Sequence, residues 1–235
     1  MLNSSLTHGV LTLTIQRSLA ANALNLAVYE AMHEALARAA QQDEVKAVIM
    51  TGEGTRAFCS GADLKETTDL PADQASQRRL NLLVRCFLEL LDFPKPVIAA
   101  VQAPAVGAGL MLAAICDEVL MADHAWVSLP EVKFDMPTPI GAAVVAARAN
   151  RSVCYKLVQL GERVSALECL QSGLAERLAP AQDLTQLCLQ RAQLLAAIPA
   201  YAYAINKQWM NREVRTVLVA AAQVAAEAHR RHDLN

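Results

Sequence analysis

Charged and aromatic residues are both scarce in this chain of 235 residues. Asp, Glu, Lys and Arg make up 19% of the sequence and Phe, Trp and Tyr only 4%, whereas apolar residues make up 54%. Soluble domains carry about 25% charged residues, so we expect much of this surface to be covered, for example between subunits. A disordered chain would be polar and strongly charged, which excludes disorder. Few aromatics and a net charge of −2 argue against nucleic-acid binding and against attraction to anionic lipid.

The six cysteines form no ligand or disulfide pattern. No CxxC motif and no Cys/His cluster occurs, which argues against a zinc site and against the disulfide framework of small secreted proteins. We therefore expect buried free thiols in a reducing compartment. The positions are Cys59, Cys86, Cys116, Cys154, Cys169 and Cys188.

Signals for export or membrane insertion are missing as well. Met1–Val10 has no basic segment followed by an apolar one, so no signal peptide is predicted. The longest apolar stretch, Pro96–Cys116, is long enough to span a bilayer, but two prolines and two glycines interrupt it. We interpret it as a buried strand, turn and helix, and expect a soluble cytoplasmic protein with no membrane partner.

Strand and helix patterns alternate in the first three fifths of the chain, which indicates an α/β fold. Strands are expected at 10–16, 46–51, 97–101, 117–121 and 126–129. Helices are expected at 26–41, capped by Asn25, at 72–91, and from about 107. From Gly141 onward only helices are predicted, at 142–149, 153–160, 166–172, 184–196 and 201–230. We predict one domain over 1–235, with an α/β core to about 140 and a helical region over 141–235.

Two loops are rich in small residues, which let a ligand approach the backbone closely. They are Phe58–Leu64 (FCSGADL) and Ala105–Gly109 (AVGAG). A helix that begins near Gly107 presents free N–H groups, and two such groups aimed at one point form an oxyanion hole. The alternative is that both loops are only tight turns. Neither contains the GKS or GKT of a phosphate-binding loop, so nucleotide hydrolysis is not expected.

Glu131 is the best acid–base candidate. It lies in Ser128–Val132 (SLPEV) between apolar residues, and burial would raise its pKa and suit it to proton transfer. The alternative is a surface glutamate in a turn. The five histidines show no partner pattern, and no GxSxG motif supports a hydrolase triad.

Several segments together resemble the crotonase (enoyl-CoA hydratase/isomerase) superfamily. The resemblance covers nearly the whole chain, and the order and spacing of the segments are more specific than any one of them. The segments are 57–66 (AFCSGADLKE), 95–101 (KPVIAAV), 107–109 (GAG), 116–117 (CD), 129–131 (LPE) and 160–166 (LGERVSA). The resemblance implies a crotonase-like spiral of ββα units, a helical C-terminal region, and a homotrimer or hexamer. It implies no cofactor, because coenzyme A or an acyl carrier protein would carry the substrate as a thioester.

The resemblance also implies roles for individual residues. The two oxyanion N–H groups would belong to Ala62 and Ala108, which would polarise a thioester carbonyl and hold an enolate. The other residues expected to contact substrate are Ser60, Gly61, Asp63, Leu64, Lys65, Gly107, Met111, Pro137 and Lys207.

Three of these residues concern the carrier end of the substrate. Asp63 and Lys65 are expected near the adenosine of coenzyme A, and Lys207 either near the adenine or as an ordinary solvated helix lysine. Arg17 is the only basic residue where the family often has one before the segment matching 22–24. A carrier-protein thioester therefore remains an alternative to coenzyme A.

Met111 is the main departure from the hydratases of the family, which hold a water molecule between two glutamates. Met111 stands at the first of these positions and Glu131 at the second, a pattern similar to Δ3,Δ2-enoyl-CoA isomerases that use one glutamate. Further on, Pro137 and Pro139 are expected to stiffen a loop and reshape the acyl pocket. Asp135 is either a second acid–base group or a capping residue.

Three functions remain open: an isomerase of unsaturated acyl thioesters, a lyase (a hydratase, or a decarboxylase or dehydratase on a carrier-bound polyketide intermediate), and a catalytically idle family member. Assembly is expected to use the alanine-rich last helix. The small-residue face expected between subunits comprises Val217, Leu218, Ala221, Ala222 and Ala225.

Overall fold

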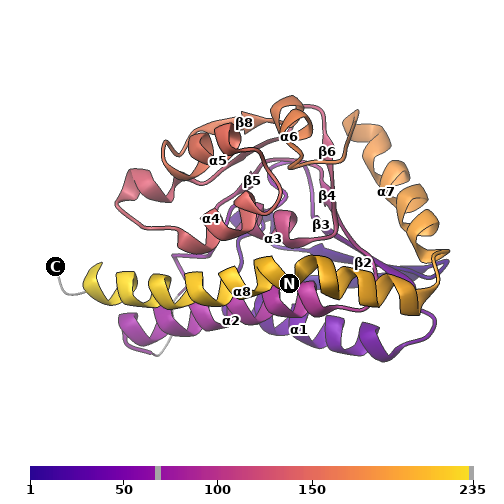
Figure 1. The fold of residues 1–235 in the computed structure, drawn as a ribbon, viewed down its shortest axis with the longest axis horizontal. Coiled ribbons are helices and arrows are strands. Elements are labelled where there is room, and N and C mark those ends of the chain that lie inside the picture. Colours follow the sequence, from indigo (N-terminus) through magenta and orange to yellow (C-terminus); the bar gives the residue numbers. More distant parts are fainter. Residues whose placement is uncertain (67–69, 233–235) are drawn as a thin grey trace.

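Two β-sheets and eight α-helices form the fold in the computed structural model, which describes residues 1–66 and 70–232 (Figure 1). In the larger sheet β1 pairs antiparallel with β2, and every other neighbouring pair is parallel. Its strands, in spatial order, are β1 (Leu2–Thr7), β2 (Val10–Ile15), β3 (Ala47–Gly52), β4 (Val97–Val101), β6 (Glu118–Ala122) and β9 (Arg177–Ala179).

The smaller sheet consists of β5 (Ala105–Val106), β7 (Trp126–Ser128) and β8 (Arg163–Ser165). The α-helices are α1 (Leu26–Gln41), α2 (Ala72–Asp92), α3 (Ala108–Ile115), α4 (Pro139–Ala146), α5 (Arg151–Val158), α6 (Ala166–Ser172), α7 (Ala181–Ala196) and α8 (Ala200–His232). Two short 3₁₀ helices, η1 (Ser18–Ala20) and η2 (Pro130–Phe134), complete the described elements. This mixed architecture confirms the predicted α/β fold class.

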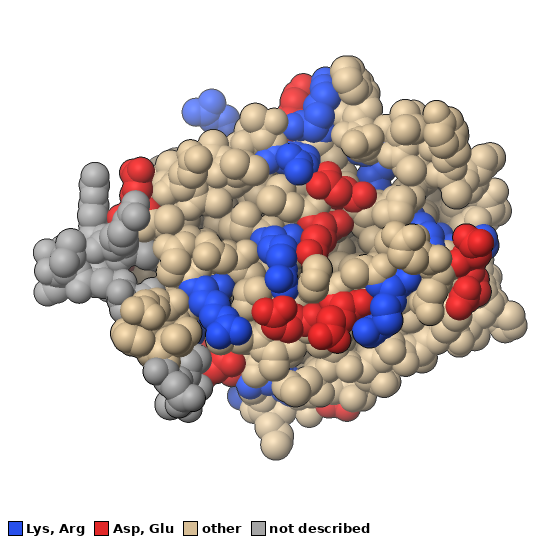
Figure 2. Space-filling view, turned by 90° about the horizontal axis from the view of Figure 1, so that it is seen from below, with Lys and Arg blue, Asp and Glu red and all other residues tan. Residues whose placement is uncertain are grey.

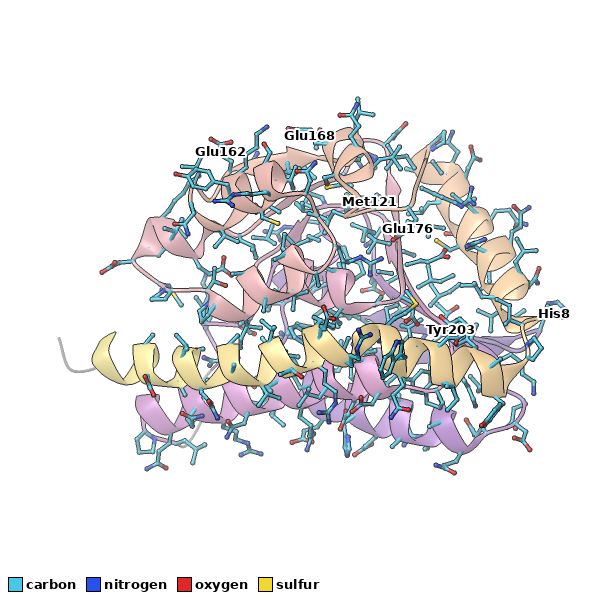
Figure 3. All side chains as sticks on the ribbon, in the orientation of Figure 1. His8, Met121, Glu162, Glu168, Glu176 and Tyr203 are labelled. Atoms are coloured by element: carbon cyan, nitrogen blue, oxygen red, sulfur yellow. The ribbon has the colours of Figure 1, made fainter. Side chains whose placement is uncertain are left out.

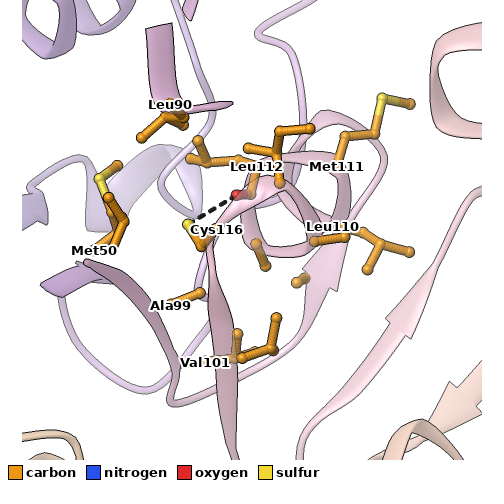
Figure 4. Close-up of a cluster of buried hydrophobic side chains, with 14 of the residues drawn as sticks. Met50, Leu90, Ala99, Val101, Leu110, Met111, Leu112 and Cys116 are labelled. Carbon is orange, nitrogen blue, oxygen red and sulfur yellow. Dashed lines mark hydrogen bonds between the residues drawn. The ribbon is translucent and has the colours of Figure 1, made fainter. Parts of the chain in front are cut away.

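The core surrounds β4 and α3, and every residue of both elements is buried (Figure 4). A parallel strand covered on both faces reads as a continuous apolar run, which is why Val97–Val101 was visible as a strand. The Cys116 thiol donates to the Leu112 carbonyl oxygen at 3.3 Å. The Met111 side chain lies on the far side of this cluster from Cys116 and Met50. It therefore points away from the strands on which α3 packs.

Several elements lie where the sequence predicts them. β4 and α6 agree residue for residue with the expected ranges. The Asn25 side chain accepts a hydrogen bond from the Val28 N–H at 3.0 Å, as expected of a cap for α1. α6 begins at Ser165, whose hydroxyl oxygen accepts from the Glu168 N–H while Glu168 accepts from the Ser165 N–H.

The prediction of helices alone after residue 141 is wrong. β8 pairs antiparallel with β7, and β9 joins the larger sheet beside β6. Each of these strands has only three residues, too few for an alternating pattern to show in the sequence. The C-terminal region is therefore built into both sheets. β1 was not predicted either, because this edge strand is mostly exposed and its polar residues give no buried face.

α8 is a single helix of 33 residues that packs along α2 and α4 of its own chain (Figure 1). Leu218, Ala221 and Ala225 are buried by these contacts. The expectation that this small-residue face lies between subunits is therefore wrong for these three residues, because small side chains let α8 approach its own chain closely. Other apolar residues of α8 are exposed: Tyr201, Ile205, Trp209, Met210, Val217, Val219 and Val224.

Charges of both signs alternate on the face shown in Figure 2 and form no patch of one sign. α1 and α2 carry pairs such as Arg85–Glu30 and His33–Glu89, each with a nitrogen–oxygen distance of 2.6 Å. All six cysteines are free thiols and five of them are buried, as expected. Within the described residues, no helix combines the length and the apolar character needed to cross a bilayer.

Candidate active site

The two small-residue loops meet at a cavity of about 400 Å³. Its wall includes Ser60, Gly61, Ala62 and Leu64 from the first loop and Val106, Gly107 and Ala108 from the second. The segment that contains η2 and the start of α4 contributes Pro130, Glu131, Phe134 and residues 136–140, and α2 and α8 contribute further side chains. The cavity thus gathers segments that lie far apart in the sequence.

Two backbone N–H groups are left unused beside this cavity. The Leu24 N–H donates to the Gly61 carbonyl oxygen and the Asp63 N–H donates to the Leu24 carbonyl oxygen, at 2.8 and 2.9 Å, which fixes Ala62 between them. Ala108 is the first residue of α3, so its N–H has no acceptor inside the helix. Neither the Ala62 nor the Ala108 N–H has an acceptor in the part of the chain that the structure describes. Two orphan donors are what an oxyanion hole requires.

Glycine conformation brings these loops together. Gly61 has φ +102°, and a Cβ placed on it would lie 3.5 Å from the Ala108 nitrogen, so the two loops are in contact. Gly107 has φ +54°, and a Cβ there would lie 2.9 Å from Oε1 of Glu131. Any larger residue at 107 would push the carboxylate away, so glycine is what allows Glu131 to lie against the backbone just before Ala108.

Glu131 lies in η2 and faces the cavity. Its Oε2 atom is buried and has no hydrogen-bond partner in the described part of the chain. Burial raises the pKa of Glu131 above its ordinary value, and no charged neighbour offsets the rise. Among the described residues that line the cavity, Glu131 is the only carboxylate. A partly desolvated carboxylate with a free oxygen beside two unused N–H groups can take up and return a proton.

Several other lining residues of the cavity are apolar. Met111 is 5% exposed and lines the cavity from α3. A Cβ on Gly141 would lie 2.9 Å from the Met111 Cε atom, so the glycine leaves room for this side chain. Pro137 and Pro139 also line the cavity. The Met111 thioether and the two proline rings therefore help to shape the pocket, and none of the described lining residues is a second acid.

Comparison with known proteins identifies the family. A family model described as enoyl-CoA hydratase/isomerase matches residues 5–233. The chain belongs to the enoyl-CoA hydratase/isomerase family. It is 33% identical over 213 residues to the 2,3-dehydroadipyl-CoA hydratase of Escherichia coli strain K12, covering 90% of this chain and 82% of that protein.

Two further similarities agree. The mitochondrial enoyl-CoA hydratase of Pongo abelii is 28% identical over 211 residues, covering 89% of this chain and 71% of that protein. A crystal structure of an enoyl-CoA hydratase from Mycobacterium avium subsp. paratuberculosis K-10 superposes with a TM-score of 0.83 at 32% identity, covering 97% of this chain and 87% of that one. The resemblance to the crotonase superfamily is thereby confirmed. The protein is an enzyme of this family, and an acyl-CoA thioester is its substrate class.

Not all residues expected to hold the carrier end of an enoyl-CoA reach the cavity. The Asp63 carboxylate pairs with the Arg17 guanidinium at 2.7 Å, and neither residue lines the cavity. Burial alone would raise the pKa of Asp63, but the hydrogen bond from Arg17 and the charges of Arg17 and Arg79 lower it below its ordinary value. Lys65 is exposed and also stays outside the cavity wall.

Lys207 lies elsewhere in the molecule. Its ammonium group pairs with the Asp117 carboxylate at 2.7 Å and donates to the Lys95 carbonyl oxygen at 3.3 Å. Only 7% of Lys207 is exposed, so the solvated-lysine interpretation is wrong, and the structure does not bring this residue to the cavity. These two contacts connect α8 to the residues just before β4 and β6. Tyr203, which precedes Lys207 by four residues on the same helix, is labelled in Figure 3.

Asp135 is exposed and ends η2 in the left-handed conformation, with φ 57°. Its N–H donates to the Val132 carbonyl oxygen at 3.3 Å, and the Met136 N–H donates to the Glu131 carbonyl oxygen at 3.1 Å. Asp135 does not line the cavity. The capping interpretation is therefore correct, and the turn it caps holds Glu131 in place.

Two polar residues of α2 that line the cavity were missed in the sequence: Ser76 and Arg79. No motif surrounds them, and only the packing of α2 decides which of its faces meets the cavity. Within the described residues no group of three or more side chains is arranged to hold a metal ion.

Proposed function

We propose that the protein is a Δ3,Δ2-enoyl-CoA isomerase that uses Glu131 as its single acid–base group. The observation that carries this proposal is the composition of the cavity wall. Glu131 is its only carboxylate within the described residues, and the position from which a second glutamate would hold water is occupied by Met111. A methionine thioether neither deprotonates water nor holds it as a carboxylate does.

The proposed reaction needs one base and two backbone donors. The thioester oxygen accepts hydrogen bonds from the Ala62 and Ala108 N–H groups. Glu131 takes a proton from C2 of a 3-enoyl thioester, and the electron pair of that C–H bond moves into the thioester, which becomes an enolate conjugated with the C3–C4 double bond. Glu131 then returns the proton to C4, leaving the double bond between C2 and C3. No water is consumed, and the enzyme ends in its starting protonation state.

The electrostatics of the site support these roles. The raised pKa of Glu131 makes its carboxylate a stronger base than a solvated glutamate. The Ala108 N–H stands at the N-terminus of α3, where the helix dipole adds partial positive charge for the enolate oxygen. Glu131 therefore removes the proton at C2, and the two N–H groups stabilise the negative charge that develops on the thioester oxygen.

Hydration of 2-enoyl thioesters is the second candidate, because relatives at about 30% identity carry that activity in their names. In that case Glu131 alone would have to orient and deprotonate the attacking water. The two functions differ in their products: an isomer of unchanged mass, or a 3-hydroxyacyl thioester that is heavier by one water.

Product identification tests the proposal. The purified protein is incubated separately with 3-enoyl-CoA and 2-enoyl-CoA, and products are identified by mass spectrometry and NMR. We expect 3-enoyl-CoA to give 2-enoyl-CoA and 2-enoyl-CoA to remain unhydrated. A 3-hydroxyacyl product from 2-enoyl-CoA as the main reaction would overturn the isomerase proposal, and binding of both thioesters without any product would identify an idle family member.

A further inference from the structure

One face of α2 brings a cation into the otherwise apolar part of the cavity. Ser76, Arg79, Leu80 and Leu83 all line the cavity, and their spacing of three, four and seven residues places them on the same side of the helix. Met111, Ile140 and the two alanines of α8 at 225 and 228 complete this end of the wall. Among the described lining residues, Arg79 is the only basic one.

The Arg79 guanidinium has no partner among the residues that the structure describes. It makes no hydrogen bond and no ion pair there, and its Nε atom is buried without an acceptor. Other arginines that are partly buried behave differently: Arg17 pairs with Asp63, Arg148 with Glu176 and Arg191 with Glu118. A guanidinium that is partly removed from water and unpaired is unfavourable, and an anion in the cavity would relieve this.

Nearby groups show where this charge acts. The charge of Arg79 lowers the pKa of Asp63, and it opposes the rise that burial causes in the pKa of Tyr29. Asp63 is already held by Arg17 at 2.7 Å, so it does not neutralise Arg79. The Tyr29 hydroxyl is buried and has no hydrogen-bond partner among the residues described. Arg79 and Glu131 line the cavity from different elements, α2 and η2.

We propose that Arg79 binds a carboxylate carried by the acyl group, so that the preferred substrates are thioesters of dicarboxylic acids, with the free carboxylate at the end away from the thioester. This inference rests on the proposed function, because it assumes that the acyl chain enters the cavity beside Ala62 and Ala108. The guanidinium accounts for specificity, since it offers two parallel N–H donors to a carboxylate and nothing to a terminal methyl group. Ser76, three residues before Arg79, supplies a hydroxyl donor on the same side.

Binding of unreactive substrate analogues tests this proposal without any turnover. Saturated acyl-CoA thioesters of four to eight carbons, each with either a terminal carboxylate or a terminal methyl group, are titrated into the full chain by calorimetry. We expect the carboxylated member of at least one pair to bind more tightly. Arg79→Gln should weaken binding of that member by about 10- to 150-fold, the range for a hydrogen-bonded charge, and leave the methyl-terminated member unchanged. Arg79→Lys, which keeps a cation but loses the paired donors, should fall between.

Arg78→Gln is the matched control, because Arg78 is the neighbouring residue, is exposed and does not line the cavity. It removes the same charge from the same helix and should leave both affinities unchanged. The same titrations with pantetheine thioesters, which lack the phosphates of coenzyme A, identify the source of the anion. A loss in Arg79→Gln that persists with pantetheine supports the acyl carboxylate.

Two results would overturn the proposal. One is equal binding of carboxylated and methyl-terminated analogues at every chain length. The other is a loss in Arg79→Gln that affects all coenzyme A thioesters equally and disappears with pantetheine, which would assign the guanidinium to a phosphate. Isomerisation of methyl-terminated 3-enoyl-CoA together with equal binding would reject this inference and keep the proposed function. Preferential binding of carboxylated analogues without isomerisation would keep this inference and reject the proposed function.

Discussion

Replacing the Glu131 carboxylate with an amide separates the proposed proton transfer from every other property of the site. Glu131→Gln keeps the size of the side chain and its position against Gly107 but removes the base. Loss of a general base lowers rates by about 100- to 10,000-fold. At 1.36 kcal/mol for each factor of ten, that is roughly 2.7 to 5.4 kcal/mol of transition-state stabilisation. KM should change little, because the Ala62 and Ala108 N–H groups hold the thioester.

The pH profile provides a second signature of the same residue. Burial raises the pKa of Glu131 above its ordinary value of 4.5, and the base acts only when ionised. The kcat/KM of the unmodified enzyme should therefore fall as the pH drops, with a midpoint above 4.5 that belongs to Glu131. Glu131→Gln should remove this limb from whatever activity remains.

Folding must be separated from chemistry. A pKa raised by folding means that Glu131 stabilises the folded state when protonated and that this contribution is lost as the pH rises through the raised value. The melting temperature of Glu131→Gln at pH 7 should accordingly be no lower than that of the unmodified protein. Rates are followed by conversion of 3-enoyl-CoA, with Asp135→Asn as the control: Asp135 is exposed, caps the same 3₁₀ helix and lies outside the cavity. Full activity in Glu131→Gln, or an equal loss in Asp135→Asn, would refute the mechanism.

Three other predictions concern the donors, the anchoring of α8 and assembly. Ala62→Pro deletes one oxyanion donor and should lower kcat about 100-fold or more. Unchanged turnover would show that the Ala62 N–H does not stabilise the enolate. Lys207→Met removes the ammonium group that pairs with the Asp117 carboxylate, which then keeps the hydrogen bond from the Val97 N–H at 2.8 Å. This change should destabilise the fold by about 3 kcal/mol, roughly 6–12 °C in Tm for a chain of this size; a shift under about 2 °C in circular-dichroism melting would contradict the structural role given to this pair. Light scattering should give a mass three or six times 25.3 kDa, because exposed apolar residues such as Trp209 remain on α8, and a monomer at micromolar concentration would exclude a trimer or hexamer.

Local sequence signals located most of the elements. Asn25 marked the start of α1 because a cap is a contact between residues three apart. β4 was visible because a strand buried on both faces is apolar throughout. β8 and β9 were not visible, since three residues are held as strands only by β7 and β6, which are distant in the sequence.

The sequence by itself determined the longer helices and the buried strands, the two small-residue loops and, through the resemblance of its segments, the family and the position of Glu131. Those features are encoded in neighbouring residues, whose caps, glycines and apolar runs act over a few positions. Only the tertiary structure decided that Lys207 is buried against Asp117, that α8 packs on its own chain, and that Arg79 faces the cavity with no partner among the described residues. The pairing and burial of a charge depend on which distant groups surround it, and these are set by how whole helices pack and not by the residues beside it.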